Sequence, residues 1–535
     1  MQCKKTLLFM MAALSTGAFG VNYSVAETTE SPDNEITSTD TSGTLDNEIT
    51  PSDALELLGK KKTPANTELK GDASGRTVYY AGYSKKFLET KALIAKGNAE
   101  DAYRLREEKL KIENQKKGKN EMPGVLFSLE QAVIALDVNK RAAAITYLEN
   151  SEAIIKEPKR KSGIVNLFSK MKNEIVNSAG FDEFGEYYGE AYERILMLNY
   201  KSIAFMLDGD RKAYNVTRRS IDWQNDEKKL FDQEMAEVKD KLKEVEDKQA
   251  EKGNILSSMG IVGVISEQYK NSESKAMQVP SAFVNPFGFY MAGIVQEYDS
   301  YEDRSLRDNA RISYQKAQEL NPDSPAIKQA LNDIQKIAPP GERLIHVVIA
   351  DGFAPEKKVL RFDYCISGKK ITMKLPIYEP VESMVSRVEM HNNQGELLAN
   401  LSQVADIDAI AMRHQYDALP KQHLKITVAV VRTVFENKML DKMGFLGDIG
   451  KKFRDDTTDP DMRSWMGMPK QILAARLFLP KGDGEVRLVS YDKNGKVLAE
   501  RNLDLGGEEH SFVYVRTVDT AMYVDQSSKL WVRAK

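Results

Sequence analysis

Apolar residues recur at three- and four-residue spacing throughout Thr77–Ala338. This spacing places them on one face of a helix, and glycine or Asp-Gly breaks separate the runs. The pattern predicts consecutive antiparallel helices joined by short turns, which is the arrangement of an α-solenoid. The predicted helices are Val78–Lys96, Ala99–Asn114, Val125–Asp137, Arg141–Lys156, Ile164–Ser178, Phe184–Leu207, Arg211–Ala250, Pro286–Tyr298, Leu306–Leu320 and Ala326–Ile337.

One helical unit carries the offsets of a tetratricopeptide repeat (TPR). Ala310, Tyr314, Ala317 and Pro322 occupy the small, aromatic, small and proline positions of that repeat. Small residues are needed where two helix backbones approach closely, and a proline cannot continue the helix. We therefore assign these residues to repeat packing. Weaker matches elsewhere are unevenly spaced, so the pattern predicts a degenerate, interrupted array of TPR-like helices.

The pattern changes at Pro339-Pro340-Gly341, after which apolar and polar residues alternate. Alternation is typical of half-buried strands, and a proline pair followed by glycine is a strong boundary signal. Two helical stretches interrupt the strands, which predicts a helical insertion at about 403–443. The expected fold is therefore multidomain, with a TPR-like α-solenoid over 77–338 and a β-sandwich-like domain over 339–535. The predicted strands are Leu344–Ala350, Lys358–Tyr364, Lys370–Pro376, Val385–His391, Ile472–Leu479, Glu485–Asp492, Val497–Leu505 and Ser511–Val518.

The amino terminus has the pattern of an export signal. Met1–Lys5 contains two lysines, and the apolar run Leu7–Leu14 follows. These are the first two regions of a secretory signal peptide, and the run is far shorter than the roughly 20 residues that span a bilayer. Small residues permit cleavage after Gly20 or Ala26, and we favour Ala26, which makes 1–26 the signal peptide. We expect an exported protein, located in the periplasm or, as the alternative, outside the cell.

The segment 27–76 is predicted to be a disordered linker. Glu27–Gly59 contains nine acidic residues, no Lys or Arg and no aromatic residue. Such a segment cannot bury enough apolar surface to offset the entropy lost on ordering. The pentapeptide Asp-Asn-Glu-Ile-Thr occurs twice in it, at Asp33–Thr37 and Asp46–Thr50, which we interpret as a low-complexity duplication.

The overall composition excludes several classes of protein. The chain has 535 residues, of which 41% are hydrophobic and 29% charged, with a formal net charge of −3. These values suit a soluble protein of several domains and give no electrostatic footprint for nucleic acid. The histidines lack metal-ligand spacing, and no phosphate-binding glycine loop or hydrolase motif is present. We therefore expect no catalytic residue, no cofactor and no metal site.

Two features remain as candidates for contacts. Trp465, with Arg463 beside it, follows an acidic loop and could stack on a sugar or anchor a partner protein. Alternatively, Trp465 fills the edge of the core, and Arg463 stacks on it or pairs with Asp461. The apolar, glycine-rich segment Gly253–Ile265 is too short to span a membrane. It is either a packed connector or a segment that touches a partner or a membrane surface.

Several short stretches follow one another in a recognisable order along the chain. They are Tyr188–Arg194, Asn285–Phe287, Ala310–Pro322, Gly352–Lys357, Arg463–Pro469, Ala475–Leu477 and Leu479–Gly482. This order resembles an uncharacterised family of Gram-negative envelope proteins. The resemblance implies degenerate TPR-like helices followed by a C-terminal β-rich domain, work in the cell envelope, and no catalytic residues. Many members of the family look like lipoproteins, whereas no cysteine follows the apolar run here until Cys365.

These features predict a non-enzymatic scaffold of the periplasm or envelope. We expect it to bind partner proteins through its TPR-like helices, because stacked helix pairs offer a long concave surface. The expected partners are envelope proteins and not nucleic acid. Two alternatives stay open, namely a secreted or surface-exposed interaction factor and a glycan- or peptidoglycan-binding module in the C-terminal domain.

Overall fold

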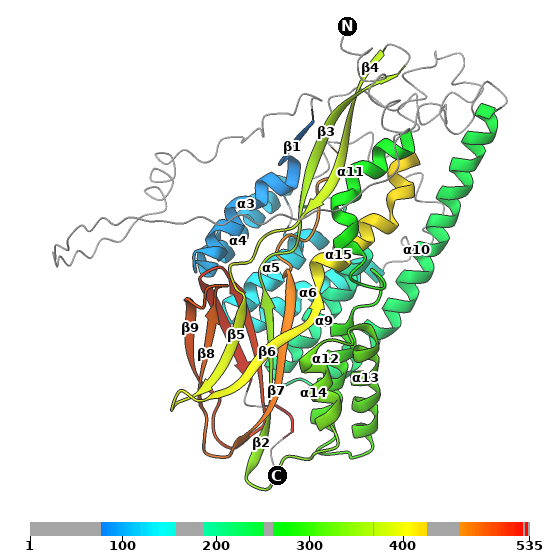
Figure 1. Cartoon of the computed structure of the whole chain (residues 1–535). Coiled ribbons are helices and arrows are strands. Elements are labelled where there is room, and N and C mark those ends of the chain that lie inside the picture. Colours follow the sequence, from blue (N-terminus) through cyan, green and yellow to red (C-terminus); the bar gives the residue numbers. More distant parts are fainter. Residues whose placement is uncertain are drawn as a thin grey trace, which may run out of the picture.

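The computed structural model describes residues 76–118, 120–156, 183–184, 186–250, 261–366, 369–424, 460–527 and 530–532. The predicted signal peptide 1–26, nearly all of the linker 27–76, the helix Ile164–Ser178 and the second half of the predicted insertion lie outside these residues. Within them, helices gather on one side of a large curled sheet (Figure 1).

Helices occupy most of the described chain before residue 334. Their bounds are α3 Gly82–Ala95, α4 Ala99–Lys117, α5 Val125–Asp137, α6 Arg141–Lys156, α9 Ala191–Asp208, α10 Lys212–Ala250, α11 Ile261–Ala276, α12 Pro286–Asp299, α13 Leu306–Leu320 and α14 Pro325–Asp333, with α15 Ile407–Asp417 later in the chain. For α5, α6 and α13 the periodicity predicts the observed bounds. It did not predict α11, nor the strand β1 (Thr77–Tyr79) that precedes α3.

The strands form two sheets. The remaining bounds are β2 Glu342–Asp351, β3 Glu356–Ile366, β4 Lys369–Glu379, β5 Arg387–Asn392, β6 Leu397–Asp406, β7 Gln471–Pro480, β8 Glu485–Tyr491, β9 Val497–Asp504, β10 Ser511–Val518 and β11 Ala521–Ser527. The smaller sheet has the order β1-β3-β4, and the larger has the order β11-β10-β2-β7-β6-β5-β8-β9. All pairs are antiparallel except β10 with β2, which is parallel.

The larger sheet curls until its two edge strands meet. β9 contacts β11, and the Arg501 guanidinium Nε on β9 donates to the carbonyl oxygen of Met522 on β11 at 3.2 Å. Alternate residues of each strand point into the interior of the curl, where Val347 on β2 and Val513 on β10 belong to one apolar cluster. Closure therefore lets a single sheet bury its own inner face.

The predicted β-sandwich is wrong because one curled, nearly closed sheet takes the place of two facing sheets. A sandwich needs two sheets whose apolar faces cover each other. Here the strands from β5 to β11 continue the sheet that begins with β2, and the inner face is covered by the same sheet. The smaller sheet does not contribute to that interior cluster.

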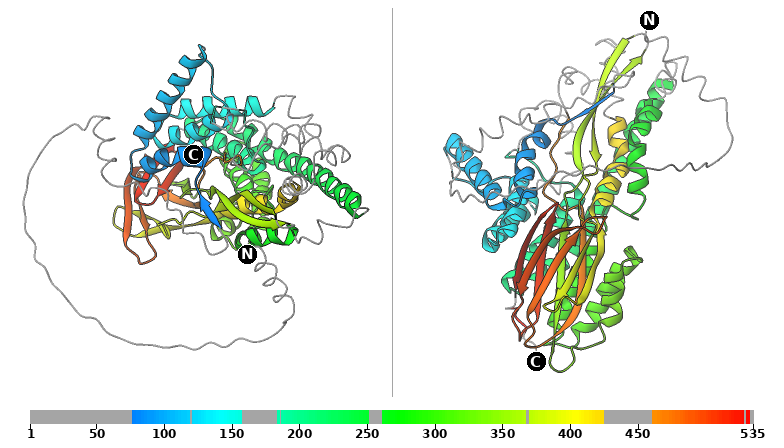
Figure 2. Two further views of the ribbon diagram at one scale, coloured as in Figure 1. Left: turned by 90° about the horizontal axis from the view of Figure 1, so that it is seen from above. Right: turned by 60° about the vertical axis from the view of Figure 1, so that its left-hand side comes forward.

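The predicted solenoid is also wrong, because the inner helices are covered on both sides. Every residue of α5 is buried, and so is α12 apart from its last residue, Asp299. α5, α9 and α12 contact the sheet on one side, while α6, α10 and α13 pack on them from the other (Figure 2). A helix that is apolar all round needs cover on all sides, and the sheet supplies it. In a solenoid the inner face of the helices is open to a partner, whereas here the sheet of the same chain covers that face.

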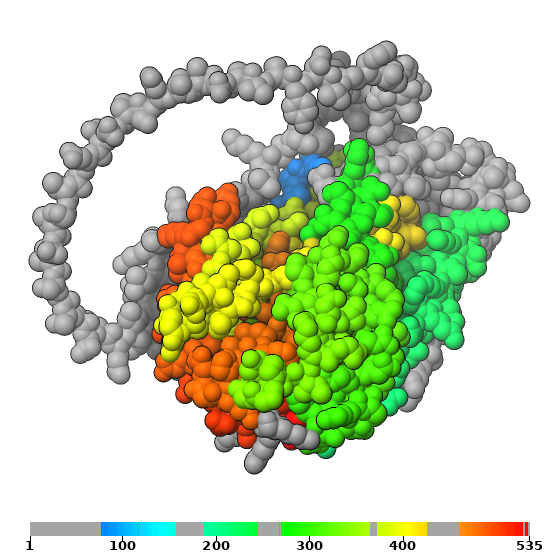
Figure 3. All heavy atoms as spheres, turned by 60° about the horizontal axis from the view of Figure 1, so that its bottom comes forward, coloured from blue at the N-terminus to red at the C-terminus, as the bar shows by residue number. Residues whose placement is uncertain are grey.

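The residues assigned to repeat packing form the contact between α12 and α13. Ala310, Tyr314 and Ala317 are fully buried. The ring of Tyr314 lies so close to α12 that a Cβ atom on Gly293 would be 2.4 Å from it. Pro322 is exposed in the turn before α14. Beyond that turn, α14 lies against β6 and β7, and the helices from α12 to α14 meet these strands at the surface (Figure 3).

Candidate binding groove

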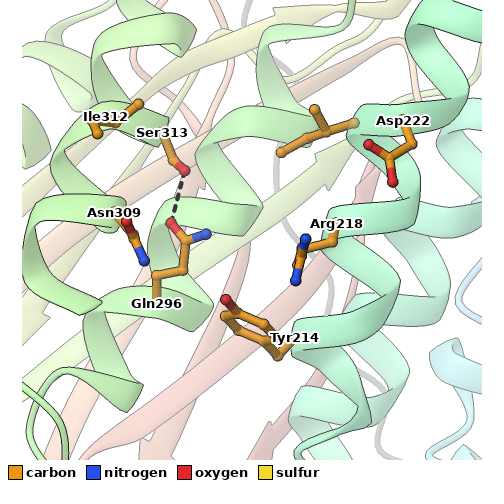
Figure 4. A pocket seen from close by; sticks show the side chains of 8 residues that line it. Tyr214, Arg218, Asp222, Gln296, Asn309, Ile312 and Ser313 are labelled. Carbon is orange, nitrogen blue, oxygen red and sulfur yellow. Dashed lines mark hydrogen bonds between the residues drawn. The ribbon is translucent and has the colours of Figure 1, made fainter. Parts of the chain in front are cut away.

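A groove of about 400 Å³ lies between α10 and α13, on the side of the helices that faces away from the sheet. One wall is α10, the other is α13, and α12 forms the floor (Figure 4). The lining residues are Tyr214, Arg218, Ile221, Asp222, Gln296, Asn309, Ile312 and Ser313. Because they come from three helices separated along the chain, the groove exists only in the folded protein.

The walls of the groove carry polar groups without partners among the described residues. Arg218 and Asn309 are exposed, and neither side chain makes a hydrogen bond or ion pair with another described residue. Figure 4 shows Tyr214 and Arg218 on α10 facing Gln296 and Asn309 across the groove. Exposed polar groups that converge on one concavity are typical of a binding site.

The floor of the groove is fixed by two hydrogen bonds from consecutive residues of α13. The Ser313 hydroxyl donates to Gln296 Oε1 at 2.7 Å, and the Tyr314 hydroxyl donates to Glu297 Oε2 at 2.9 Å. The first bond faces the groove and the second faces the core. One lone pair of the Gln296 oxygen accepts from Ser313, so the amide keeps a second lone pair and its N–H groups for a ligand.

Glu297 in turn anchors α12 to the sheet. Its carboxylate accepts from Arg476 on β7 at 2.6 and 3.0 Å and contacts His346 Nε2 on β2 at 3.0 Å. All three side chains are buried. Burial alone would raise the pKa of Glu297, but Arg476 and His346 outweigh it and lower the pKa to about 2. The groove therefore has a floor that is held in place before any ligand arrives.

Trp465 and Arg463, the predicted contact residues, lie inside the molecule. Trp465 is fully buried, its ring packs against Tyr200 with centroids 5.6 Å apart, and its backbone N–H donates to Glu193 Oε1 at 2.8 Å. Arg463 pairs with Asp461 at 2.8 Å. A sugar or partner cannot reach Trp465 in this structure, because the ring fills the core. These positions agree with the alternative in which Trp465 fills the core and Arg463 pairs with Asp461.

The loop that carries Trp465 is bound to α5 by a second buried carboxylate. Glu130 accepts hydrogen bonds from the backbone N–H groups of Met466 and Gly467, at 2.7 and 2.8 Å, and from the Tyr83 hydroxyl at 3.0 Å. Burial raises the pKa of Glu130 to about 8, against the lowering effect of these donors and Arg106. A Cβ on Gly467 would lie 2.3 Å from Glu130 Oε2, so a larger residue would have to displace this buried carboxyl group. This cluster joins helices to the sheet.

Several other predictions concern sites that the structure describes in part. The described residues contain no group of three or more His, Cys, Asp or Glu side chains placed to hold a metal ion. In the same part of the chain, no helix combines the length and apolarity required to cross a membrane. Of the candidate contact segment, 253–260 lie outside the described residues, as do the side chains of 261–265, which begin α11.

The groove residues carry only a weak signal in the sequence. Tyr214, Arg218 and Asp222 are spaced by four residues, which places them in one line on α10. A polar line on a helix is ordinarily a solvated face. It becomes a groove wall only because α13 lies opposite, and this pairing of distant helices has no local signature.

Comparison with known proteins found no matching family model, no matching curated protein and no matching solved structure.

Proposed function

We propose that the protein is a non-catalytic, exported scaffold that binds a partner polypeptide in the groove between α10 and α13. The observation that carries the proposal is the set of unpartnered polar side chains over a floor fixed by Glu297 and Arg476. A rigid floor lowers the entropic cost of binding, and a mixture of donors and acceptors suits the N–H and C=O groups of a peptide. Export rests on the amino-terminal sequence, with the periplasm as the first expectation.

The proposal moves the binding surface from the concave face of a repeat array to the outer side of the helices. The inner side contacts the sheet and is closed to partners. A secreted or surface-exposed factor would use the same groove and differ only in location, which fractionation of periplasm and medium decides. The glycan-binding alternative loses its named residue, because Trp465 is fully buried.

A photoreactive amino acid at a groove position tests the proposal in cells that export the full chain. Ile312 is 40% exposed and lines the groove, and Ile112 on α4 is 51% exposed and does not line it. We expect a crosslinked polypeptide from position 312 at a yield several times that from position 112. Equal yields from the two positions would contradict a binding role for the groove.

A further inference from the structure

Among the described residues that line the groove, Arg218 is the one permanently charged donor. Its guanidinium has N–H donors and no acceptor, whereas the amides of Asn309 and Gln296 and the hydroxyls of Tyr214 and Ser313 can both donate and accept. Asp222 supplies the one carboxylate of the described lining. A ligand that pairs with Arg218 must bring an acceptor, and a carboxylate matches an arginine fork in geometry and charge.

Arg218 differs from the other arginines near the groove. Arg211 pairs with Glu302, Arg219 lies 3.1 Å from Glu152, and Arg311 lies 2.8 Å from Asp308. These contacts neutralise each of them within the chain. Arg218 has no such acceptor among the described residues, and it lines the groove.

Asp222, one turn further along α10, does not neutralise Arg218. The same order and spacing forms an ion pair elsewhere in the chain, where Arg413 lies 2.9 Å from Asp417. Arg218 and Asp222 make no such pair, and Figure 4 shows the Arg218 side chain extended toward the groove. The guanidinium thus lines the groove without an ion pair to its own helix.

An aliphatic site lies next to this charge. Ile221 precedes Asp222 on one wall, and Ile312 on the opposite wall is 40% exposed. Burying both isoleucines against an apolar side chain of a ligand would gain free energy in proportion to the area removed from water. The groove therefore combines a carboxylate site with a neighbouring aliphatic site.

We infer that the partner segment carries an acidic side chain next to an aliphatic one, with the carboxylate held by Arg218 and the aliphatic group held by Ile221 and Ile312. This inference rests on the proposed function, because it names the chemistry of the segment that enters the same groove. The chain itself contains this chemistry twice, in the Glu-Ile steps of Asp33–Thr37 and Asp46–Thr50. These pentapeptides supply a probe of known sequence.

The test measures binding of labelled peptides to the full chain by fluorescence anisotropy. The acidic probe contains Asp-Asn-Glu-Ile-Thr, a neutral probe contains Asn-Asn-Gln-Ile-Thr, and a basic probe contains Lys-Asn-Lys-Ile-Thr. We expect the acidic probe to bind at least about tenfold more tightly than the neutral one, since a desolvated arginine–carboxylate pair is a strong contact. Arg218→Glu should weaken the acidic probe to a similar extent and strengthen the basic probe.

Lys229→Glu is the matched control, because it makes the same charge change on an exposed position of α10 outside the groove. It should leave all three affinities within about twofold. Equal binding of the acidic and neutral probes, or full binding by Arg218→Glu, would overturn the inference. A crosslink from position 312 to residues 33–50 of the same chain would support the inferred acidic and aliphatic chemistry and would overturn the proposed function, because the chain itself would then occupy the groove. If none of the probes binds but position 312 still crosslinks to a polypeptide in cells, the inference about an acidic and aliphatic segment is wrong. The proposal that the groove binds a partner polypeptide then stands without it.

Discussion

The α12–α13 pair lies between two arginines with opposite surroundings. Arg476 is fully buried and its guanidinium is bound by Glu297, whereas Arg218 is exposed and unpaired among the described residues. The first holds α12 against the sheet, and the second faces an open groove over the same helix. The difference separates charges that assemble the fold from charges that remain for a ligand. A substitution of Arg476 should therefore lower the stability of the fold, whereas a substitution of Arg218 should weaken partner binding and leave stability nearly unchanged.

The largest effect is expected from Arg476→Met. This change leaves Glu297 as a buried carboxylate without its cation, which typically costs about 3–5 kcal/mol of unfolding free energy. Denaturant unfolding of the full chain measures it. Arg487→Met is the control, because Arg487 forms a solvent-exposed pair with Glu500 and should cost less than about 1 kcal/mol. Similar losses for the two variants would mean that the buried pair does not hold α12 in place.

Gly293→Ala should have the next largest effect. The added methyl group would lie 2.4 Å from the Tyr314 ring, so the helices must separate or the ring must move. Overpacking of this kind typically costs about 1–3 kcal/mol. In the double variant with Tyr314→Ala the two changes should be strongly non-additive, because the clash is absent. Additive losses in denaturant unfolding would show that α12 and α13 do not pack as described.

Stability should fall as the pH rises from 7.5 to 8.5. Glu130 has a pKa of about 8 when folded, against 4.5 for an ordinary glutamate, so at the start of this range most folded molecules keep a proton that the unfolded state has lost. The buried histidines do not contribute here, because burial lowers the pKa of His414 and His510 to about 4 and unfolded histidines have also lost their protons above pH 7.5. Asp137, whose pKa burial raises to about 7, adds a smaller loss of the same sign. We expect a total loss of about 0.5–1 kcal/mol over this range.

Glu130→Gln isolates this effect because it removes the titrating group. The variant is expected to be less stable overall, since the amide replaces one of the two oxygens that accept hydrogen bonds with an NH₂ group that cannot accept, yet its stability should vary less with pH. Glu319→Gln, on the exposed side of α13, should keep the slope of the parent. An unchanged slope in Glu130→Gln would assign the pH dependence to another buried group.

The smallest effect on stability is expected at Arg218. Arg218→Glu breaks no contact among the described residues, so the melting temperature should stay within about one degree of the parent. Partner binding should be lost in the same variant. A clear drop in melting temperature, seen by calorimetry, would show that Arg218 is needed for folding and would remove the contrast with Arg476.

Local patterns in the sequence predicted the elements better than their assembly. The bounds of α5, α6 and α13 follow from apolar spacing, because helix formation depends on neighbours within a few residues. The position of the sheet over α5, α9 and α12 depends on contacts between residues far apart in the chain. Glu130 within the apolar helix α5 was one available hint, since a charge on a fully buried helix needs donors from another element.

The candidate site could not be predicted for the same reason. Trp465 follows an acidic loop in the sequence, which suggested a contact residue. The segment that carries it folds inward instead, and Glu193 accepts a hydrogen bond from its backbone N–H. Arg218 and Asn309 are ordinary polar residues on two separate helices. They line a common groove only because α10 and α13 lie on either side of it over α12.

If the groove between α10 and α13 is the contact surface, filling it should prevent partner binding. Asn309→Trp places a large side chain in the groove from an exposed position, and Glu319→Trp places the same side chain on α13 outside it. The yield of the partner captured by each full-length variant is compared at matched melting temperatures. The structure predicts that Asn309→Trp loses most of the partner and that Glu319→Trp retains it. Equal recovery by the two variants would contradict the claim.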